Sequence, residues 1–251
     1  MKRLIKKVFK TFGFDIVSSY QLYRNDPLFQ LKKIFKDDDV NVIFDVGAAT
    51  GEFCLKFNKM YNNSKIYAFE PQLDYYKHNV KYNGNICNSF QFALSDKIGE
   101  FDFFITKGKE SSSLLKSQKT NTSFDNQLEI SESIKITTNT ITNFCNEHKI
   151  ERINIIKLDT QGTELQVLQG AENFLLNQKI DAIYTEALFM PFYENQPIFH
   201  NYVDYLQKFN YHLYNIYNCV YINNSILCWA DAIFLRKELY EMQLIRNNQD
   251  R

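Results

Sequence analysis

The sequence of 251 residues is poor in cysteine, glycine and proline, and it has no excess charge of either sign. Its five cysteines are scattered and no two form a Cys-x-x-Cys pair, which argues against a disulfide framework and a structural zinc site. We therefore expect a protein of the reducing cytoplasm. The 29 basic and 29 acidic residues balance, so no global field would gather nucleic acid. No apolar run approaches the roughly 18 residues that a membrane span requires.

The sequence does contain enough apolar material for one large domain. Hydrophobic residues make up 45% of the chain and aromatic residues 16%, so a large core can form. The length suits a single α/β domain with additions at its ends. We expect this domain to span residues 40–238, between an N-terminal helical extension over residues 1–39 and a C-terminal tail over residues 239–251.

The first twelve residues predict an amphipathic helix. Lysines interrupt the apolar residues there, so the segment is not a signal peptide. Five apolar residues from Leu4 to Phe12 share one helical face, and five basic residues share the other. The helix would either pack across the domain with its basic face in solvent, which we favour, or make a weak contact with an anionic membrane surface.

From about residue 41, strand patterns alternate with helical ones. This order predicts an α/β fold with a doubly wound, mostly parallel sheet and helices on both faces. The segment GEFDFFITK alternates apolar and polar residues, as expected for an antiparallel excursion from the main sheet. Residues 108–132 predict a polar loop. The last two strand patterns are joined by a connection too short for a parallel crossover, so they should pair antiparallel near the C-terminus. The strands expected in the sheet are NVIFDVG, KIYAFE, NSFQFALS, INIIKLDT, IDAIYTEAL, YHLYNIYN and ADAIFLRK.

Acidic and hydroxyl side chains end the predicted strands. Ligands of open α/β sheets bind at the carboxyl ends of the strands, and buried carboxylates are costly unless they are paired. The repetition at one edge of the sheet therefore predicts a binding site there. The residues concerned are Asp45, Glu70, Ser95 with Asp96, Asp159 with Thr160, and Glu186.

The loop DVGAATG after the first strand predicts a cofactor site. Gly47 and Gly51 allow a sharp turn and a close approach to a ligand, in a G-x-x-x-G spacing that differs from the dinucleotide G-x-G-x-x-G. Glu70 ends the next strand, where an acid often binds a ribose diol. The negative charge of Asp45 would repel a pyrophosphate, but it would attract the ammonium and sulfonium groups of S-adenosylmethionine. That cofactor is therefore predicted, and a nicotinamide-dependent oxidoreductase remains an alternative.

The segment KLDTQGTELQVLQGA, residues 157–171, resembles the signature K-x-D-x-x-G-x-E-x-x-V-L-x-G-A of the FkbM family of S-adenosylmethionine-dependent methyltransferases. The segments DVGAATGEF, AFEP, ALSDKIGEFDFF and SSSL agree with it, so that the resemblance spans about residues 40–236. One position departs from the family pattern: the loop usually reads D-x-G-A-N-x-G, and Ala49 stands in place of the asparagine. The matching signature residues are Lys157, Asp159, Gly162, Glu164, Val167, Leu168, Gly170 and Ala171.

The resemblance implies a class I methyltransferase (Rossmann-like) fold and a set of cofactor-binding residues. Glu70 would hold the ribose hydroxyls, with Pro71 on the adenine side. Ser95 and Asp96 would lie near the adenine, and Asp159 would face the transferred methyl group. The methionine end would be held by Asp45, Gly47, Ala48 and Gly51.

A hydroxyl acceptor must lose its proton as the new bond forms, so Asp159 is the candidate general base or orienting group. Glu186, on the neighbouring strand end, is a second candidate. Lys157 is expected to be structural, and Glu164 to be a first-turn helix charge. Asp159, Glu186 and His200 do not have a spacing that demands a metal, and none is predicted.

The acceptor is expected to be a hydroxyl of a sugar, a glycan or a small hydroxylated metabolite, as in glycan biosynthesis. A D/N-P-P-aromatic motif, common in enzymes that methylate amino groups of nucleic acids, is absent because no two prolines are adjacent and the segment reads DTQG. A nucleic-acid acceptor is therefore not expected. A non-catalytic adaptor that keeps the methyltransferase fold remains a further alternative.

Overall fold

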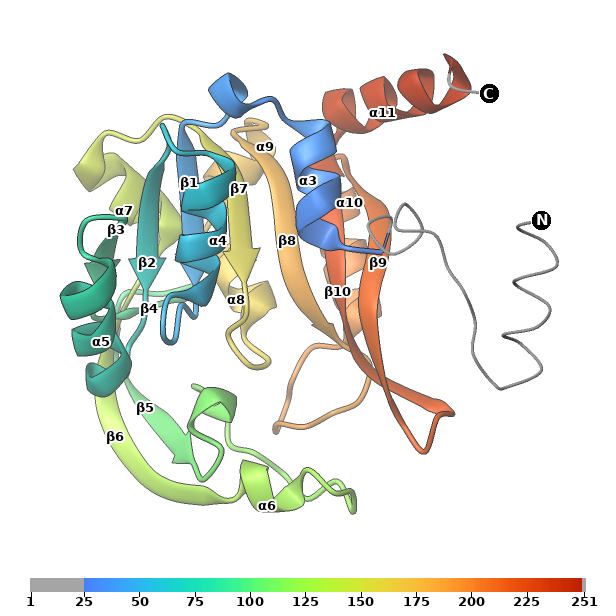
Figure 1. The fold of residues 1–251 in the computed structure, drawn as a ribbon. Coiled ribbons are helices and arrows are strands. Elements are labelled where there is room, and N and C mark those ends of the chain that lie inside the picture. The colour runs from blue at the N-terminus through green and yellow to red at the C-terminus, as the bar shows by residue number, and fades with distance from the viewer. Residues whose placement is uncertain (1–24, 250–251) are drawn as a thin grey trace, which may run out of the picture.

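The computed structural model describes residues 25–249, so the helix expected over residues 1–12 lies outside the described residues. Seven strands form a central sheet in the order β3-β2-β1-β7-β8-β10-β9 (Figure 1). The strands β3, β2, β1, β7 and β8 are parallel, and β10 runs antiparallel to both of its neighbours. This confirms the predicted mostly parallel, doubly wound sheet with one reversed strand near the C-terminus. The strand bounds are β1 Val42–Val46, β2 Lys65–Phe69, β3 Cys87–Phe90, β7 Ile153–Leu158, β8 Ile180–Leu188, β9 Tyr211–Ile222 and β10 Ile226–Arg236.

Helices cover both faces of this sheet because its central strands are apolar on both sides. All six residues of β7 are buried, as expected for a parallel strand between two helical layers. One core lies under α7 Ile141–His148, α8 Glu164–Gln169, α9 Glu172–Leu176 and α10 Phe199–Gln207. The other lies under α3 Pro27–Ile34, α4 Glu52–Met60 and α11 Lys237–Gln249, and this side is called the α3–α4 face below.

The alternation of side chains along β1 and β7 places charged groups on the α3–α4 face. Ile43 of β1 and Ile155 of β7 belong to the core on that face. Side chains two residues apart on a strand share a face, so Asp45 and Lys157 point the same way. The parallel register pairs Asp45 directly with Lys157. Two charged side chains thus meet inside an otherwise apolar layer.

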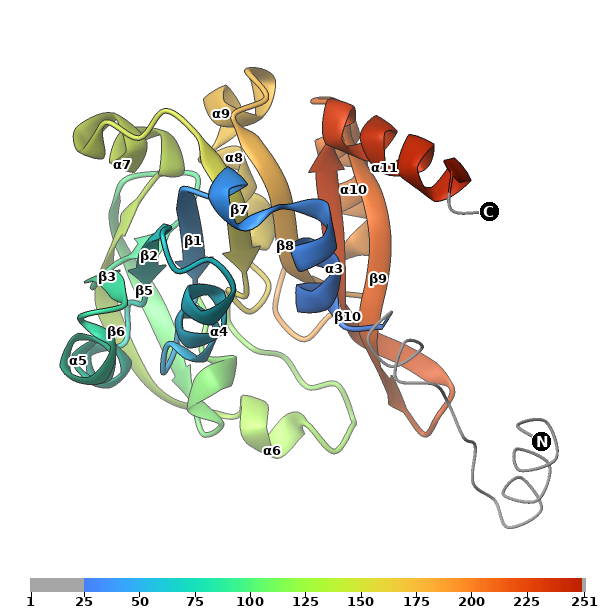
Figure 2. The ribbon, with the colours of Figure 1, turned by 45° about the horizontal axis from the view of Figure 1, so that its top comes forward.

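A second, three-stranded sheet has the order β4-β6-β5. In Figure 1, β5 and the start of β6 lie below the carboxyl ends of β1 and β2, and Figure 2 shows β5 and β6 side by side. β5 pairs antiparallel with β6, which confirms the predicted antiparallel excursion. β6 was not predicted, because most of its side chains are exposed and polar. The strands are β4 Ala93–Leu94, β5 Gly99–Thr106 and β6 Ile130–Asn139.

Two expectations about this region were wrong in detail. The single strand expected in NSFQFALS is divided, because β3 pairs with β2 in the large sheet and β4 pairs with β6 in the small one. Residues 108–132 are not wholly a loop, since they contain the 3₁₀ helix η2 Lys109–Ser111 and the short helix α6 Asp125–Leu128.

The described part of the N-terminal extension contributes to the domain core. Helix α3 begins after Asp26, whose carboxylate accepts from the backbone N–H groups of Leu28 and Phe29 at 2.9 and 3.3 Å. Leu31 and Ile34 are buried in the core of the α3–α4 face. The short 3₁₀ helix η1 Asp37–Asp39 then leads into β1. None of the helices within residues 25–249 is long and apolar enough to cross a membrane.

Candidate active site

A cavity of about 420 Å³ lies at the carboxyl ends of the central strands. Its walls come from the ends of β1, β2, β7 and β8 and from the segment after β5. This is where open α/β sheets bind ligands, so the cavity is the candidate active site. The sequence-predicted residues that line it are Gly47, Ala48, Glu70, Pro71, Asp159 and Glu186, and those that do not are Asp45, Gly51, Ser95 and Asp96.

The loop after β1 lines the cavity and contains two glycines with left-handed backbone angles. Gly47 has φ +74° and Gly51 has φ +77°. A Cβ on Gly47 would lie 1.9 Å from the carbonyl oxygen of Asp159, so only glycine allows the loop to approach β7 this closely. Gly51 is the N-cap residue of α4. The two glycines therefore fix both the position of the loop and the start of the helix that follows it.

Ala49, which departs from the family pattern, adopts φ +43°. Its N–H donates to Oε2 of Glu70 at 2.8 Å, and its carbonyl accepts from Nδ2 of Asn79 at 2.7 Å. Asn83 donates to the carbonyl of Thr50 at 3.0 Å. Both asparagines lie on the second helix, α5 Leu73–Asn83, and are buried. The two side-chain amides thus fix the loop by donating to its carbonyl groups. In the sequence, the spacing of two asparagines at i and i+4 on one helix could have indicated this role.

Glu70 is a buried carboxyl group at the end of β2. Its two oxygens accept from the N–H groups of Ala49, at 2.8 Å, and Gln72, at 2.9 Å. Burial raises the pKa of Glu70 to about 7, although these backbone donors favour the charged form. Each oxygen keeps a further lone pair for a ligand donor.

Asp45 does not line the cavity but lies completely buried beneath the loop. Its Oδ1 lies 3.5 Å from Nζ of Lys157, and its Oδ2 accepts from the thiol of Cys54 at 3.2 Å. Burial raises the pKa of Asp45, and the Lys157 charge opposes this. A direct contact between Asp45 and a cofactor stays a prediction, because its partners in the structure are Lys157 and Cys54.

Lys157 joins the loop to the candidate base. Its Nζ lies 3.3 Å from Oδ2 of Asp159, donates to the carbonyl of Gly47 at 3.3 Å, and lies 4.7 Å from the ring centre of Phe53. The side chain is buried, and the neighbouring carboxylates of Asp159 and Asp45 hold its pKa above the ordinary value against the effect of burial.

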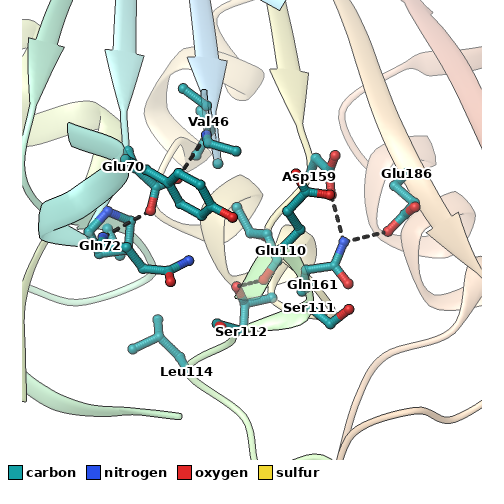
Figure 3. Close-up of a pocket in the computed structure, with 18 of the residues that line it drawn as sticks. Val46, Glu70, Gln72, Glu110, Ser111, Ser112, Leu114, Asp159, Gln161 and Glu186 are labelled. Atoms are coloured by element: carbon teal, nitrogen blue, oxygen red, sulfur yellow. Dashed lines mark hydrogen bonds between the residues drawn. The ribbon is translucent and has the colours of Figure 1, made fainter. Parts of the chain in front are cut away.

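Asp159 and Glu186 are bridged by one amide, as Figure 3 shows. Nε2 of Gln161 donates to Oδ1 of Asp159 at 2.8 Å and to Oε2 of Glu186 at 3.0 Å. The hydroxyl of Tyr193 lies 2.9 Å from Oε1 of Gln161. Gln161 itself has φ +56°, an uncommon conformation for a residue other than glycine. Sequence reasoning missed Gln161, although it lies within the most specific motif.

The two bridged carboxyl groups have different environments. Burial, followed by the negative charge of Asp159, raises the pKa of Glu186 well above its ordinary value. The Asp159 side chain is half-buried and has Lys157 as a direct counter-ion. The raised pKa favours the protonated form of Glu186, which can then act as a hydrogen-bond donor.

Glu164 is the first residue of α8, as expected, but it is completely buried. It accepts from the N–H groups of Thr160, at 2.7 Å, and Gly162, and from the hydroxyl of Tyr202 at 2.9 Å. It therefore shapes the loop that carries Gln161, rather than serving as an exposed helix charge.

Ser95 and Asp96 follow β4 and lie behind the cavity wall. The Ser95 hydroxyl donates to Oδ1 of Asp96 at 3.2 Å. Ala93 and Leu94, directly before them, are the residues of this segment that line the cavity. The roles of Ser95 and Asp96 near an adenine stay predictions.

The far end of the cavity is aromatic. The rings of Phe124 and Trp229 have centroids 5.0 Å apart, and those of Phe192 and Trp229 are 5.8 Å apart. Leu128 and Leu188 complete this wall. Phe124 and Leu128 come from the segment predicted as a polar loop, so that segment closes the site.

Within residues 25–249, no three His, Cys, Asp or Glu side chains are grouped so that they could hold a metal ion. His200 is hydrogen-bonded to its neighbour Asn201 at 3.2 Å and does not line the cavity.

Comparison with known sequences gives a consistent result. The profile of the methyltransferase FkbM domain matches residues 45–213. The chain is similar to 2-O-methyltransferase NoeI of Sinorhizobium fredii (strain NBRC 101917 / NGR234), with 26% identity over 176 residues that cover 67% of this chain and 72% of that protein. It is also similar to methyltransferase sdnD of Sordaria araneosa, with 25% identity over 191 residues that cover 63% of this chain and 74% of that protein.

The solved structures similar to this chain include two with a bound cofactor. One is magnesium protoporphyrin IX methyltransferase (ChlM) from Synechocystis PCC 6803 with bound SAM, with a TM-score of 0.46 at 8% identity over 94% of this chain and 96% of that one. The other is Aeropyrum pernix fibrillarin with bound S-adenosyl-L-methionine, with a TM-score of 0.45 at 10% identity over 78% of this chain and 66% of that one.

Proposed function

The chain belongs to the FkbM methyltransferase family and is a methyltransferase, and from this premise we propose that it transfers a methyl group from S-adenosylmethionine to a hydroxyl of a sugar, a glycan or a small hydroxylated metabolite. The observation that carries the proposal is that one cavity is lined at one side by the glycine loop and Glu70, and at another by Asp159 and Glu186. The similarity to a protein named as a 2-O-methyltransferase supports an oxygen acceptor.

The residues around the cavity fit this cofactor. Because Gly47 has no Cβ, the loop can lie directly against the backbone of Asp159 and bring its own backbone to the cavity wall. Glu70 is held by two backbone donors with lone pairs left over for ribose hydroxyls. Pro71, Ala93 and Leu94 offer apolar surface beside it for an adenine ring. Asp45 and Asp159 add negative charge near the loop, which suits a cationic ligand.

When bound, S-adenosylmethionine supplies a methyl group on a sulfonium leaving group. Asp159 would accept the proton of the acceptor hydroxyl or orient that hydroxyl for attack. Lys157 and Gln161 hold the Asp159 carboxylate from two sides, so little reorganisation is needed. Protonated Glu186 can donate to a neighbouring oxygen of the acceptor. The aromatic wall around Trp229 gives that end of the site an apolar surface, which disfavours water there.

The proposal has a direct test. Isothermal titration should show binding of S-adenosylhomocysteine and none of NADH; the reverse result would favour the nicotinamide-dependent alternative. Transfer of a labelled methyl group should then be assayed against glycan and metabolite extracts, with mass spectrometry of the product. A labelled hydroxyl supports the proposal. A protein that binds the cofactor product but labels no hydroxyl would contradict it, and would fit the adaptor alternative.

The location and the partners follow as parts of this proposal. All five cysteines are free, which suits a reducing cytoplasm. A small-molecule or glycan acceptor is expected as the partner, and no nucleic acid. A weak membrane contact through residues 1–12 stays a proposal for a segment outside the described residues.

A further inference from the structure

A second cavity, of about 580 Å³, lies beside the candidate active site on the α3–α4 face. Its walls come from the start of α3, the first turn of α4 and the strands β7, β8, β9 and β10. Both cavities are lined by Phe53, Lys157, Asp159 and Glu186. A molecule in the second cavity therefore reaches the same carboxyl groups that face the proposed cofactor site.

Three carboxyl groups stand in a row along this cavity. Asp231 of β10 is directly opposite Glu186 of β8 in the antiparallel register. Asp159 is one residue beyond Leu158, which pairs with Thr185, so it lies in the same row as Glu186. Neighbouring strands are about 4.8 Å apart, so the three carboxyl groups present hydrogen-bonding oxygens at regular intervals. A polyhydroxylated ligand matches such spacing, because its oxygens also recur a few ångströms apart.

Two hydrogen bonds fix the orientation of the Asp231 carboxyl group. Its Oδ2 accepts from the hydroxyl of Tyr184 at 3.0 Å and from Nδ2 of Asn218 at 2.6 Å. Within residues 25–249 no hydrogen bond is made to Oδ1, which leaves that oxygen for a ligand. Neither Asp231 nor Asn218 lines the cofactor cavity. They belong to the second cavity alone.

The charge of the lining restricts the ligand. Four acidic side chains face two basic ones, Lys56 and Lys157. Both bases are already paired, since Lys56 lies 2.6 Å from Glu52 and Lys157 contacts Asp159 and Asp45. With Glu186 protonated and Asp159 paired with Lys157, an anionic ligand would still meet the carboxyl group of Asp231, whose partners Tyr184 and Asn218 are neutral. Hydroxyl groups, by contrast, find hydrogen-bonding oxygens and amides there. The ring of Phe53, which has the ammonium groups of Lys56 and Lys157 within 4.9 Å of its centre, adds apolar surface to the lining.

We propose that the second cavity is the acceptor site and takes an uncharged carbohydrate residue, with one hydroxyl at Asp159 and others at Asp231 and Asn218. This inference rests on the proposed function, since it takes Asp159 as the point of methyl transfer. It adds the location of the acceptor and the class of sugar: neutral pyranosides bind, and uronic acids do not.

The test uses the full chain loaded with S-adenosylhomocysteine. Binding of a panel of neutral methyl pyranosides and of the matching methyl uronides is measured by saturation-transfer NMR. Neutral pyranosides should bind, and each uronide should bind at least about tenfold more weakly. Asp231→Asn and Asn218→Gly should weaken pyranoside binding about tenfold, the cost of one hydrogen bond to a charged group. Equal binding of uronides, or no binding of any pyranoside, would overturn the inference.

The variants have a matched control. Asn218 and Asn224 both have positive φ, +49° and +55°, which glycine also adopts, so Asn218→Gly and Asn224→Gly make the same change inside and outside the cavity. Asn224→Gly should bind pyranosides like the unmodified protein. The affinity for S-adenosylhomocysteine should be unchanged in all three variants. If Asn218→Gly and Asp231→Asn methylate a hydroxyl acceptor with the same KM as the unmodified protein, the cavity assignment alone is refuted. If the unmodified protein does not bind S-adenosylhomocysteine, the proposed function is refuted.

Discussion

Nζ of Lys157 lies 3.3 Å from Oδ2 of Asp159, so the proposed base is anchored by a buried cation. The same nitrogen lies 3.5 Å from Oδ1 of Asp45, beneath the cofactor loop. One ammonium group thus compensates two carboxylates that belong to neighbouring strands. Loss of this cation would leave both acids without their counter-ion. It should therefore lower the stability of the sheet and also release the Asp159 side chain from its position in the site.

We expect Lys157→Met to lower the free energy of unfolding by about 3–5 kcal/mol, the cost of breaking a buried ion pair from one side. Asp45→Asn combined with Lys157→Met should recover part of this loss, because the two residues interact. Chemical denaturation measures both. Lys135→Met, which removes an exposed ion pair of 3.0 Å with Asp102, is the control and should cost less than about 1 kcal/mol. Equal costs for the two single variants would contradict the role of Lys157.

Asp159→Asn should leave the affinity for S-adenosylhomocysteine within about twofold and reduce turnover about 10²- to 10⁴-fold, the usual contribution of a general base. The reason is that asparagine keeps the size of the side chain but cannot accept the acceptor proton. Turnover is measured by labelled methyl transfer, and affinity by titration calorimetry. Asp204→Asn, the same change at an exposed residue of α10 that lines neither cavity, serves as the control. Unchanged turnover in Asp159→Asn would remove the base assignment.

Glu70→Gln should weaken S-adenosylhomocysteine binding and abolish part of its pH dependence. Burial raises the pKa of Glu70 to about 7, so in the unmodified protein the carboxylate becomes a full acceptor only near neutral pH. Its affinity should therefore rise by up to about tenfold per unit as the pH rises toward 7, and then level off. Calorimetry between pH 5.5 and 8.5 tests this, with the pH range chosen to be about 1.5 units on either side of the Glu70 pKa. The same slope in both proteins would show that another group is responsible.

The stability of the unliganded protein should respond in the opposite sense. The pKa of Glu70 in the folded protein lies above its ordinary value of 4.5, so the neutral group is favoured on folding. That stabilisation is fully present below pH 4.5 and is lost as the pH rises through about 7. Glu70→Gln should show a smaller decrease in the free energy of unfolding over this range.

Gly47→Ala should destabilise the protein by about 2 kcal/mol or more and abolish cofactor binding. The new Cβ would lie 1.9 Å from the Asp159 carbonyl oxygen, and φ +74° is strained for alanine. Gly99→Ala is the matched control, because the nearest atoms there are the movable Phe101 side chain at 3.2 Å and the backbone has no positive φ. Thermal unfolding and calorimetry compare the two. A Gly47→Ala protein with normal binding would contradict the close loop–strand contact.

Ala49→Asn should stabilise the protein by about 0.5–1 kcal/mol, because asparagine adopts the left-handed backbone at φ +43° more readily than alanine. For a domain of this size the melting temperature should rise by about 1–4 °C. Ala49→Val, a β-branched residue at the same position, should lower it. Scanning calorimetry distinguishes the two. If Ala49→Asn lowered the melting temperature and Ala49→Val raised it, the hydrogen bonds of Ala49 with Glu70 and Asn79, rather than its backbone conformation, would determine the effect.

Several features of the site were predictable because they depend on local pattern. The apolar runs that end in Asp45, Glu70, Asp159 and Glu186 predict strands whose carboxyl ends meet at one edge, and the sheet order confirms this arrangement. The short connection before the last strand predicted the reversed β10. β6 was missed because only Ile136 and Thr138, on one face near its end, are buried, and a strand with so many exposed polar residues has the composition of a loop.

The sequence by itself determined the sheet, the family and the acids at the strand ends, because alternation, chain length and motif spacing are properties of neighbouring residues. Only the tertiary structure decided which of those acids face a cavity. Asp45 and Asp159 stand equally at strand ends, yet one is buried under Lys157 and the other lines two cavities. Asn79, Gln161 and Asp231 acquire their roles from elements distant in sequence. Such contacts depend on how strands and helices pack, which no local pattern encodes.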